Sequence, residues 1–170
     1  MEVSIVPSKT PFPKAVKAEK IKGLSEWYAL YQAYNAVFKV QELALIPQGI
    51  SLPQLQLLAL LAQEQRPLAI SELATWMVKE PNSLTGLVDR TEAKGWVHTH
   101  GDPKDRRKRL VEFTKAGVEK FEEAFAVANQ AGEKLFGVLT ASQLEQLKAG
   151  CKKLRDTAVA DLSRKPAYRM

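Results

Sequence analysis

The chain has 170 residues, of which 45% are hydrophobic and 26% are charged, as is usual for one soluble globular domain with a short appendage. The single cysteine, Cys151, excludes an intramolecular disulfide framework and indicates a reducing compartment. No apolar run reaches membrane-spanning length, and the N-terminus lacks the continuous apolar stretch of a signal peptide. We therefore expect a cytoplasmic protein without a membrane partner.

The net charge of +6 is concentrated in three segments of the chain. Residues 1–22 carry five lysines against two glutamates, residues 101–109 five basic against two acidic residues, and residues 151–170 six against two. Clustered positive charge of this kind is typical of a nucleic-acid binder. Charge alone leaves open a second interpretation, a solvated basic surface or tail.

The N-terminal part of the chain divides into an arm and a helix. Residues 1–22 contain three prolines and scattered lysines, and are predicted to form a basic arm that either grips DNA or acts as a solubilising tail. Within residues 23–50 we predict a helix that is stopped by Pro47 and Gly49. This helix is rich in aromatic residues: Trp27, Tyr28, Tyr31, Tyr34 and Phe38.

Two further helices follow in close succession. Ser51 and Gln54 form the pattern of a capping box, which satisfies free N–H groups at a helix start. After the break at Pro67, the stretch "ISELATWM" predicts a short helix. Its expected buried face consists of Leu73, Trp76 and Met77.

A third helix is predicted between Pro81, which suits a first helical position, and Gly95, which suits a left-handed stop. Leu84, Leu87 and Val88 mark its buried side. Small residues that can form hydrogen bonds crowd the first turns of the opposite side, which is the end that a groove-reading helix presents. The exposed set is Asn82, Ser83, Thr85, Gly86, Asp89 and Arg90.

The segments "WVHTH" and "RLVEF" flank a strongly basic loop and predict a β-hairpin. A turn signal at residues 101–103 leads into five cations with Asp105 among them: Lys104, Arg106, Arg107, Lys108 and Arg109. Helices joined by a short turn, followed by a hairpin with a basic tip, make a winged helix-turn-helix.

Helices are also predicted for the C-terminal part of the chain. Thr114 caps the first of them, and Thr140 with Gln143 forms a second capping box. The last helix carries a heptad seam, which is a packing face for a partner helix. Its members are Leu144, Leu147, Cys151, Leu154 and Ala158, and we expect Cys151 to be a small buried residue of this seam rather than a redox sensor.

Five short strings stand together in an order and spacing that resemble the multiple-antibiotic-resistance regulators (MarR family). They are "ELA" at 72–74, "LVDR" at 87–90, "KGWV" at 94–97, "DPKDRR" at 102–107 and "FTKAG" at 113–117. The resemblance implies a mainly α fold with a small β-hairpin wing, a winged helix-turn-helix between dimerisation helices, and an obligate homodimer. The expected boundaries are 1–22 for the arm, 23–50 for the N-terminal dimerisation helix, 51–114 for the DNA-binding domain and 115–170 for the C-terminal dimerisation helices.

The resemblance also assigns roles toward double-stranded DNA. It implies that Arg107 enters the minor groove and that Asp105 holds it through an ion pair; the negative potential of a narrow minor groove attracts a guanidinium independently of the family. Other cations are expected to contact phosphates: Arg90, Lys104, Arg106, Lys108 and Arg109. Direct base reading falls to Asn82, Ser83 and Thr85, with Gly86 permitting close backbone approach.

Two other residue groups have competing interpretations. Trp27, Tyr28 and Tyr31 either bind a small aromatic or phenolic effector, as the resemblance implies, or pack in the core and dimer interface. His98 and His100 point to one side of a strand and could ligate zinc. We favour an exposed pair without metal, because no carboxylate or thiol cluster completes a site, and we expect no cofactor.

The sequence thus predicts a transcriptional regulator, in the first place a repressor, that binds a pseudo-palindromic operator as a homodimer and is released by a small ligand. The alternative is a winged-helix module that binds another protein. Five cations in the predicted wing argue against that alternative. An enzyme is not expected, because no nucleophile lies in a pattern with a general base.

Overall fold

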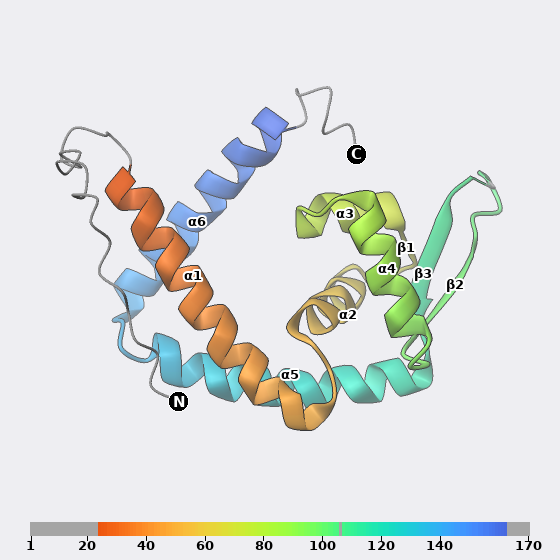
Figure 1. The fold of residues 1–170 in the computed structure, drawn as a ribbon, viewed down its shortest axis with the longest axis horizontal. Helices are drawn as coiled ribbons and strands as arrows, with labels where there is room; N and C mark the ends of the chain where they lie inside the picture. Colours follow the sequence, from red (N-terminus) through yellow and green to blue (C-terminus); the bar gives the residue numbers. More distant parts are fainter. Residues whose placement is uncertain (1–23, 106, 163–170) are drawn as a thin grey trace, which may run out of the picture. The chain divides into compact units, whose positions relative to one another are not determined.

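The computed structural model describes residues 24–105 and 107–162, so the predictions for the N-terminal arm and for Arg106 lie outside the described residues. The chain divides into two units, residues 1–36 and 37–170, with the boundary inside the first helix. The elements in order are α1 (Leu24–Leu45), the 3-10 turn η2 (Ile46–Gln48), α2 (Leu52–Glu64), β1 (Leu68–Ala69), α3 (Ile70–Met77), α4 (Pro81–Glu92), β2 (Val97–Gly101), β3 (Arg109–Phe113), α5 (Lys115–Phe136) and α6 (Ala141–Leu162) (Figure 1). The predicted fold class, mainly helical with a hairpin wing, is confirmed.

The helix boundaries follow from local hydrogen bonds that the sequence predicted. At the start of α2, the Gln54 backbone N–H donates to Ser51 Oγ at 3.4 Å and the Ser51 N–H donates to Gln54 Oε1 at 3.1 Å. The same reciprocal pair joins Thr140 and Gln143 at the start of α6. Gly49 adopts a φ of +64°, which favours glycine and ends the turn after α1.

The sheet has three antiparallel strands in the order β1-β3-β2. In the predicted hairpin, Thr99 pairs with Val111, and the outermost pair before the loop is Gly101 with Arg109. Strand β1 pairs Leu68 with Val111 on the other edge of β3. The sequence did not predict β1, because two residues are too short to show a strand period.

The core lies between α2, α3, α4 and the sheet. Its fully buried side chains include Leu57, Leu58, Leu68, Leu73, Leu84, Val88 and Val111. Buried Thr91 satisfies its hydroxyl by donating to the Leu87 carbonyl at 2.7 Å. The prediction that Trp76 is buried was wrong: the residue is 45% exposed, and Cζ of Arg155 from α6 lies 5.8 Å from the centroid of its ring.

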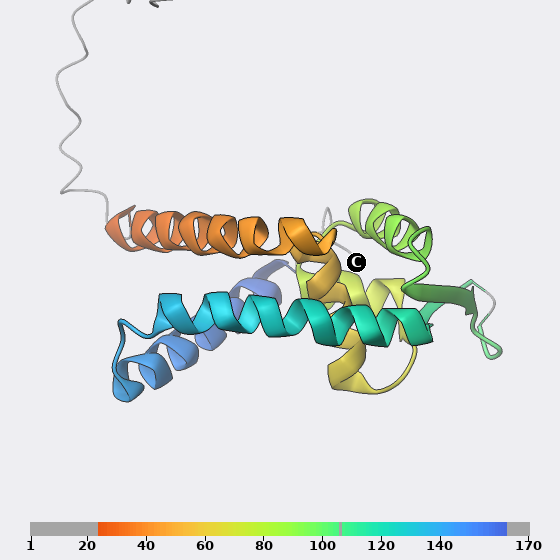
Figure 2. The same ribbon diagram turned by 90° about the horizontal axis from the view of Figure 1, so that it is seen from below.

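Helix α5 runs from the base of the hairpin past α2 (Figures 1 and 2). The first turn of α5 is fixed to the hairpin by the Thr114 N–H, which donates to the Trp96 carbonyl at 3.2 Å. Gly117 is buried at this junction. The wing and the helical part are therefore joined through the start of α5.

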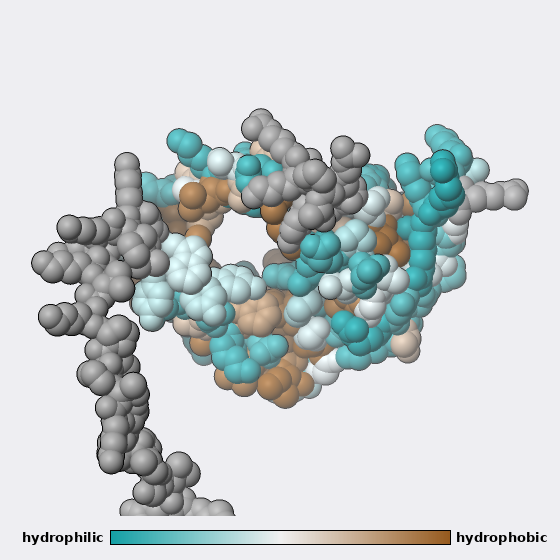
Figure 3. Space-filling view, turned by 45° about the horizontal axis from the view of Figure 1, so that its top comes forward, coloured by the Kyte–Doolittle hydropathy of each residue, from teal (hydrophilic) through white to brown (hydrophobic). Residues whose placement is uncertain are grey.

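Helix α6 leaves its heptad seam open to solvent within the single chain. Leu147 and Leu154 are exposed, and so is Cys151, which corrects the prediction of a buried cysteine. The physical reason is that a heptad seam is buried only by a partner helix, whereas here Leu144, Leu147 and Cys151 line an open groove beside α2 and α5. Hydrophobic surface is open to solvent in the space-filling view as well (brown in Figure 3).

Among residues 24–105 and 107–162, no single helix is long and apolar enough to cross a membrane. The segments Ser25–Gln48 and Leu52–Glu64 reach the required length and composition only as a pair, and they are bent by 87°.

Candidate nucleic-acid interface

Helix α4 presents the polar face that the sequence predicted for it. Leu84, Leu87 and Val88 are buried, whereas Asn82 and Ser83 in the first turn are exposed. The Thr85 hydroxyl donates to the Pro81 carbonyl at 3.0 Å, which leaves its oxygen lone pairs for an external donor. The first two turns of α4 thus offer an amide and two hydroxyls to a partner.

Gly86 makes room for a cation on the same face. A Cβ atom at this position would lie 3.3 Å from Nη1 of Arg90, so the guanidinium rests over the bare backbone of the glycine. Because Arg90 is exposed and flexible, its side chain could shift to admit a Cβ atom, and the close approach of Gly86 to DNA stays a prediction.

The wing loop is shaped by its two aspartates. Asp102 Oδ1 accepts from the Lys104 N–H at 2.7 Å, and Asp105 Oδ1 accepts from the Arg107 N–H at 3.2 Å. Backbone bonds of 3.0 Å and 2.8 Å close the loop from Asp102 to Lys108 and from Lys108 to Asp105. Because the acidic side chains are occupied by backbone donors, the cations project from a defined turn.

Arg107 projects into solvent, with 93% of its side chain exposed. Its Nε lies 3.4 Å from Asp105 Oδ1, so the ion pair implied by the family resemblance is present. Lys104 and Lys108 are exposed on the same loop. The wing is a hydrophilic projection at the right of Figure 3.

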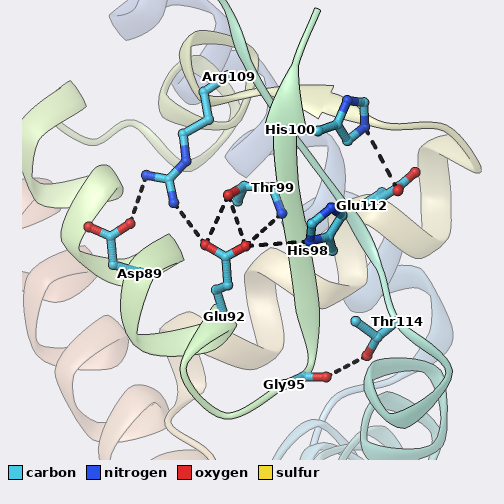
Figure 4. A network of polar contacts seen from close by, with 9 residues as sticks. All are labelled: Asp89, Glu92, Gly95, His98, Thr99, His100, Arg109, Glu112 and Thr114. Carbon is cyan, nitrogen blue, oxygen red and sulfur yellow. Dashed lines mark hydrogen bonds and ion pairs between the residues drawn. The ribbon is translucent and has the colours of Figure 1, made fainter.

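Arg109 differs from the other cations of the wing. Its Nη1 lies 2.7 Å from Asp89 Oδ1 and its Nη2 lies 2.9 Å from Glu92 Oε2, both on α4 (Figure 4). Arg109 was expected to contact a phosphate, and its pairing with Asp89 and Glu92 was not predicted. Asp89 and Glu92, three positions apart on one helix, indicated a candidate site for a cation. Arg109 lies 20 residues from Asp89 and 17 residues from Glu92 in the sequence, so the pairing was not evident.

Glu92 also receives hydrogen bonds from the other wing strand. The Thr99 N–H donates to Glu92 Oε1 at 2.7 Å, and the Thr99 hydroxyl lies 2.8 and 2.9 Å from its two oxygens. Desolvation opposes ionisation of Glu92, but the bonds from Thr99 and Arg109 outweigh it and lower the pKa of this carboxyl. The hydrogen bond with Asp89 is the largest cause that raises the pKa of Arg109. Glu92 and Arg109 are therefore both charged at neutral pH.

A pH-dependent stability follows from the lowered pKa of Glu92. A carboxyl whose pKa is lower in the folded state contributes stability that is present above its unfolded pKa, about 4.3, and lost as the pH falls through the folded value. We expect Glu92→Gln to lower the melting temperature at pH 7, and the gap to the wild type to narrow below about pH 4. Thermal unfolding between pH 3 and 7 measures this; a gap that stays constant would contradict the account.

The two histidines of β2 lie beside this network. Their rings stack with centroids 6.1 Å apart. His98 Nδ1 is 3.8 Å from Glu92, and His100 Nε2 is 3.8 Å from Glu112. Across residues 24–105 and 107–162, no group of three or more His, Cys, Asp or Glu residues is arranged to hold a metal ion.

The aromatic residues considered for effector binding lie on the surface of α1. Trp27 stacks on Tyr31 with ring centroids 5.3 Å apart, and both are more than half exposed, as is Tyr28. A cavity of about 870 Å³ is found elsewhere, between α2, α5 and α6. Its apolar walls include Leu55, Phe125, Phe136 and Leu147. Polar groups stand among them at Gln56, Asn129 and Lys148.

Comparison with known proteins places this geometry in a family. The sequence profile of the MarR family matches residues 50–108. The transcriptional repressor NicR of Pseudomonas putida is 32% identical over 113 residues, which cover 66% of this chain and 69% of NicR. The transcriptional activatory protein BadR of Rhodopseudomonas palustris is 32% identical over 93 residues, 54% of this chain and 53% of BadR, so that match spans about half of the relative.

A solved structure gives the same fold. A mutant of MarR from E. coli, complexed with operator DNA, superposes with a TM-score of 0.71 at 23% identity, covering 77% of this chain and 94% of that chain. The relatives named above are thus a transcriptional activator and a transcriptional repressor. On the strength of the NicR match and the family profile, this chain belongs to the MarR family of transcriptional regulators.

Proposed function

We propose that this protein is a cytoplasmic transcriptional repressor that binds a pseudo-palindromic operator as a homodimer. Each protomer places α4 in the major groove and the wing tip in the adjacent minor groove, and the two half-sites lie about one helical turn apart. The observation that carries the proposal is the pairing of a polar α4 face with a cationic wing on one scaffold. The helix can read base edges while the wing holds position on the backbone.

The open surfaces of the terminal helices support the homodimer. Trp27, Tyr28 and Tyr31 on α1, and Leu147 and Leu154 on α6, are large apolar or aromatic side chains exposed in the single chain. A second copy would remove them from water, and burial of a large side chain contributes roughly 1.5–3 kcal/mol. We therefore assign the aromatic residues of α1 to dimerisation.

A small-molecule effector is the second part of the proposal. The cavity between α2, α5 and α6 has a volume within the range usual for ligand sites, and its apolar walls suit an aromatic ring. Lys148 at its edge suits an anionic group. The cavity is lined by residues of both α2 and α6, so an occupant would favour one arrangement of these two helices. A coupling of roughly 1–3 kcal/mol between effector binding and DNA binding changes DNA occupancy 5- to 150-fold.

Two substitutions test the division between base reading and backbone contact. Asn82→Ala should change base preference at one position of each half-site, because an amide pairs with adenine through both of its polar atoms. Lys104→Ala should weaken binding to all sequences evenly and lower the slope of log affinity against log salt by about 0.9. Binding to a panel of duplexes that differ at single positions, measured at several salt concentrations, provides both readouts.

The competing hypothesis, a protein-interaction module, predicts that the two substitutions have no sequence-specific effect on DNA binding. Such a module has no use for a wing that presents exposed Lys104, Arg107 and Lys108 to solvent. If Asn82→Ala and Lys104→Ala changed the affinity for every duplex by the same factor, Asn82 would not read bases. If neither affected DNA binding, the proposed interface would be wrong.

A further inference from the structure

The Glu92 carboxylate is a junction at which both strands of the wing are tied to α4. It accepts hydrogen bonds from Thr99 on β2 and from Arg109 on β3, and Arg109 continues to Asp89 one turn earlier on α4 (Figure 4). We propose that Arg109 is a positioning residue for DNA binding: it braces the wing against α4, and it acts on DNA through that geometry instead of contacting a phosphate. The inference rests on the proposed function.

The guanidinium of Arg109 is already committed within the protein. Both of its terminal nitrogens face carboxylates, at 2.7 and 2.9 Å, and only 36% of the side chain is exposed. Turning toward a phosphate would break both pairs and leave two carboxylates beside the polyanion. One guanidinium between two carboxylates also leaves the cluster with a net negative charge, which does not attract a phosphate. Arg107, at 93% exposure, meets one carboxylate through its Nε, and its terminal nitrogens are not part of that pair.

The place of Arg109 in the hairpin is where a brace has the most effect. Arg109 pairs with Gly101 in the last rung of the ladder before the loop. The other end of the hairpin is already fixed to α5, through the bond from Thr114 to the Trp96 carbonyl. At about 3.4 Å per residue, five strand residues separate the two fixed ends by roughly 14–17 Å. The brace therefore limits rotation of the hairpin about its base, and hence the position of the tip.

The distance between α4 and the wing tip matters because the two contact different grooves of one duplex. A fixed distance lets the protein distinguish operators in which the minor-groove segment is correctly placed from those in which it is shifted. A free wing would adapt to either. Arg109 would thus determine specificity for the spacing between the two contacts, without contacting DNA itself.

Lysine in place of arginine separates the two possible roles. Arg109→Lys keeps the positive charge that a phosphate contact needs, but one ammonium does not reproduce the planar fork that bridges Asp89 and Glu92. Lys108→Ala is the matched control, since Lys108 is the neighbouring exposed cation. The probes are a duplex selected by the wild-type protein from a random pool, and a copy in which the wing-contacted segment is shifted by one base pair.

We expect both Arg109→Lys and Arg109→Ala to bind the selected duplex about 5- to 10-fold more weakly, with an unchanged salt slope, as the loss of two partly exposed ion pairs allows. Their discrimination against the shifted duplex should fall, whereas Lys108→Ala should keep that discrimination and lose about 0.9 of salt slope. A merely structural role would lower the melting temperature and reduce binding to both duplexes equally.

Three results would overturn the brace. Arg109→Lys that binds like the wild type, while Arg109→Ala loses salt slope, would show a phosphate contact. Equal losses on the two duplexes would show a stability effect, and unchanged affinity and discrimination in both variants would show no role at all. If the wild-type protein selected no duplex, the proposed function itself would be wrong. If the wild type selected a duplex and Arg109→Lys bound it equally well, only the brace would be wrong.

Discussion

Arg107→Ala should weaken operator binding by roughly 1–3 kcal/mol, about 5- to 150-fold, without changing thermal unfolding. The side chain is 93% exposed, so its removal leaves no cavity and no buried partner. Its conformation is prepared by Asp105, which accepts from both the backbone N–H and the side-chain Nε. A guanidinium held ready in this way loses little conformational freedom on entering a narrow minor groove, where the negative potential is strongest.

Two variants control for this prediction. Lys134→Ala removes one exposed cation from α5, away from the wing, and should leave the affinity nearly unchanged. Asp105→Ala keeps Arg107 but releases it, and should give a smaller loss than Arg107→Ala. The measurements are direct titrations of a selected operator, with thermal melts of each protein. If Arg107→Ala bound the operator as tightly as the wild type, the wing would have no part in the mechanism.

Gly117→Ala should have the largest effect on stability, lowering the free energy of unfolding by about 3 kcal/mol or more. A Cβ atom at Gly117 would overlap the carbonyl oxygen of Trp96 and lie 2.7 Å from its carbonyl carbon, so backbone would have to move. The displaced segment is the base of the hairpin, which the Thr114 N–H holds through the same carbonyl oxygen. We therefore expect loss of wing geometry together with stability.

Gly132→Ala in the same helix is the matched control. The nearest atom to a Cβ at Gly132 is 3.8 Å away, on the flexible side chain of Gln41, which is ordinary contact. Replacing an internal helical glycine by alanine should then stabilise the protein by up to about 1 kcal/mol. Chemical denaturation of both variants measures the two values. A small, equal effect at the two positions would mean that α5 and the hairpin are not packed as described.

Those parts of the fold that depend on local chemistry were predictable from the sequence. The capping boxes at Ser51 and Thr140 satisfy backbone groups within their own first turn, so their residue pattern alone indicates a helix start. The hairpin strands were recognisable because they flank a turn signal. The ion pair between Asp105 and Arg107 spans two residues, and the family resemblance supplied it.

The features that were missed depend on distant residues or on a second chain. Arg109 was expected to contact a phosphate, because charge alone does not reveal that carboxylates of α4 lie opposite it in the fold. Trp76 was expected in the core because it lies on the same predicted apolar face of α3 as Leu73. Its ring instead lies beside Arg155 of α6. Cys151 was expected to be buried because a heptad seam implies a partner helix, but within the single chain the residue is exposed.

The most direct test of the regulator account is selection of bound sequences from a random duplex pool, carried out at two salt concentrations. The account predicts a two-fold symmetric motif whose half-sites lie about one helical turn apart, and which persists at the higher salt concentration. Binding without an enriched motif, lost as salt rises, would show that the basic wing only grips the DNA backbone. That result would contradict the reading of bases by α4.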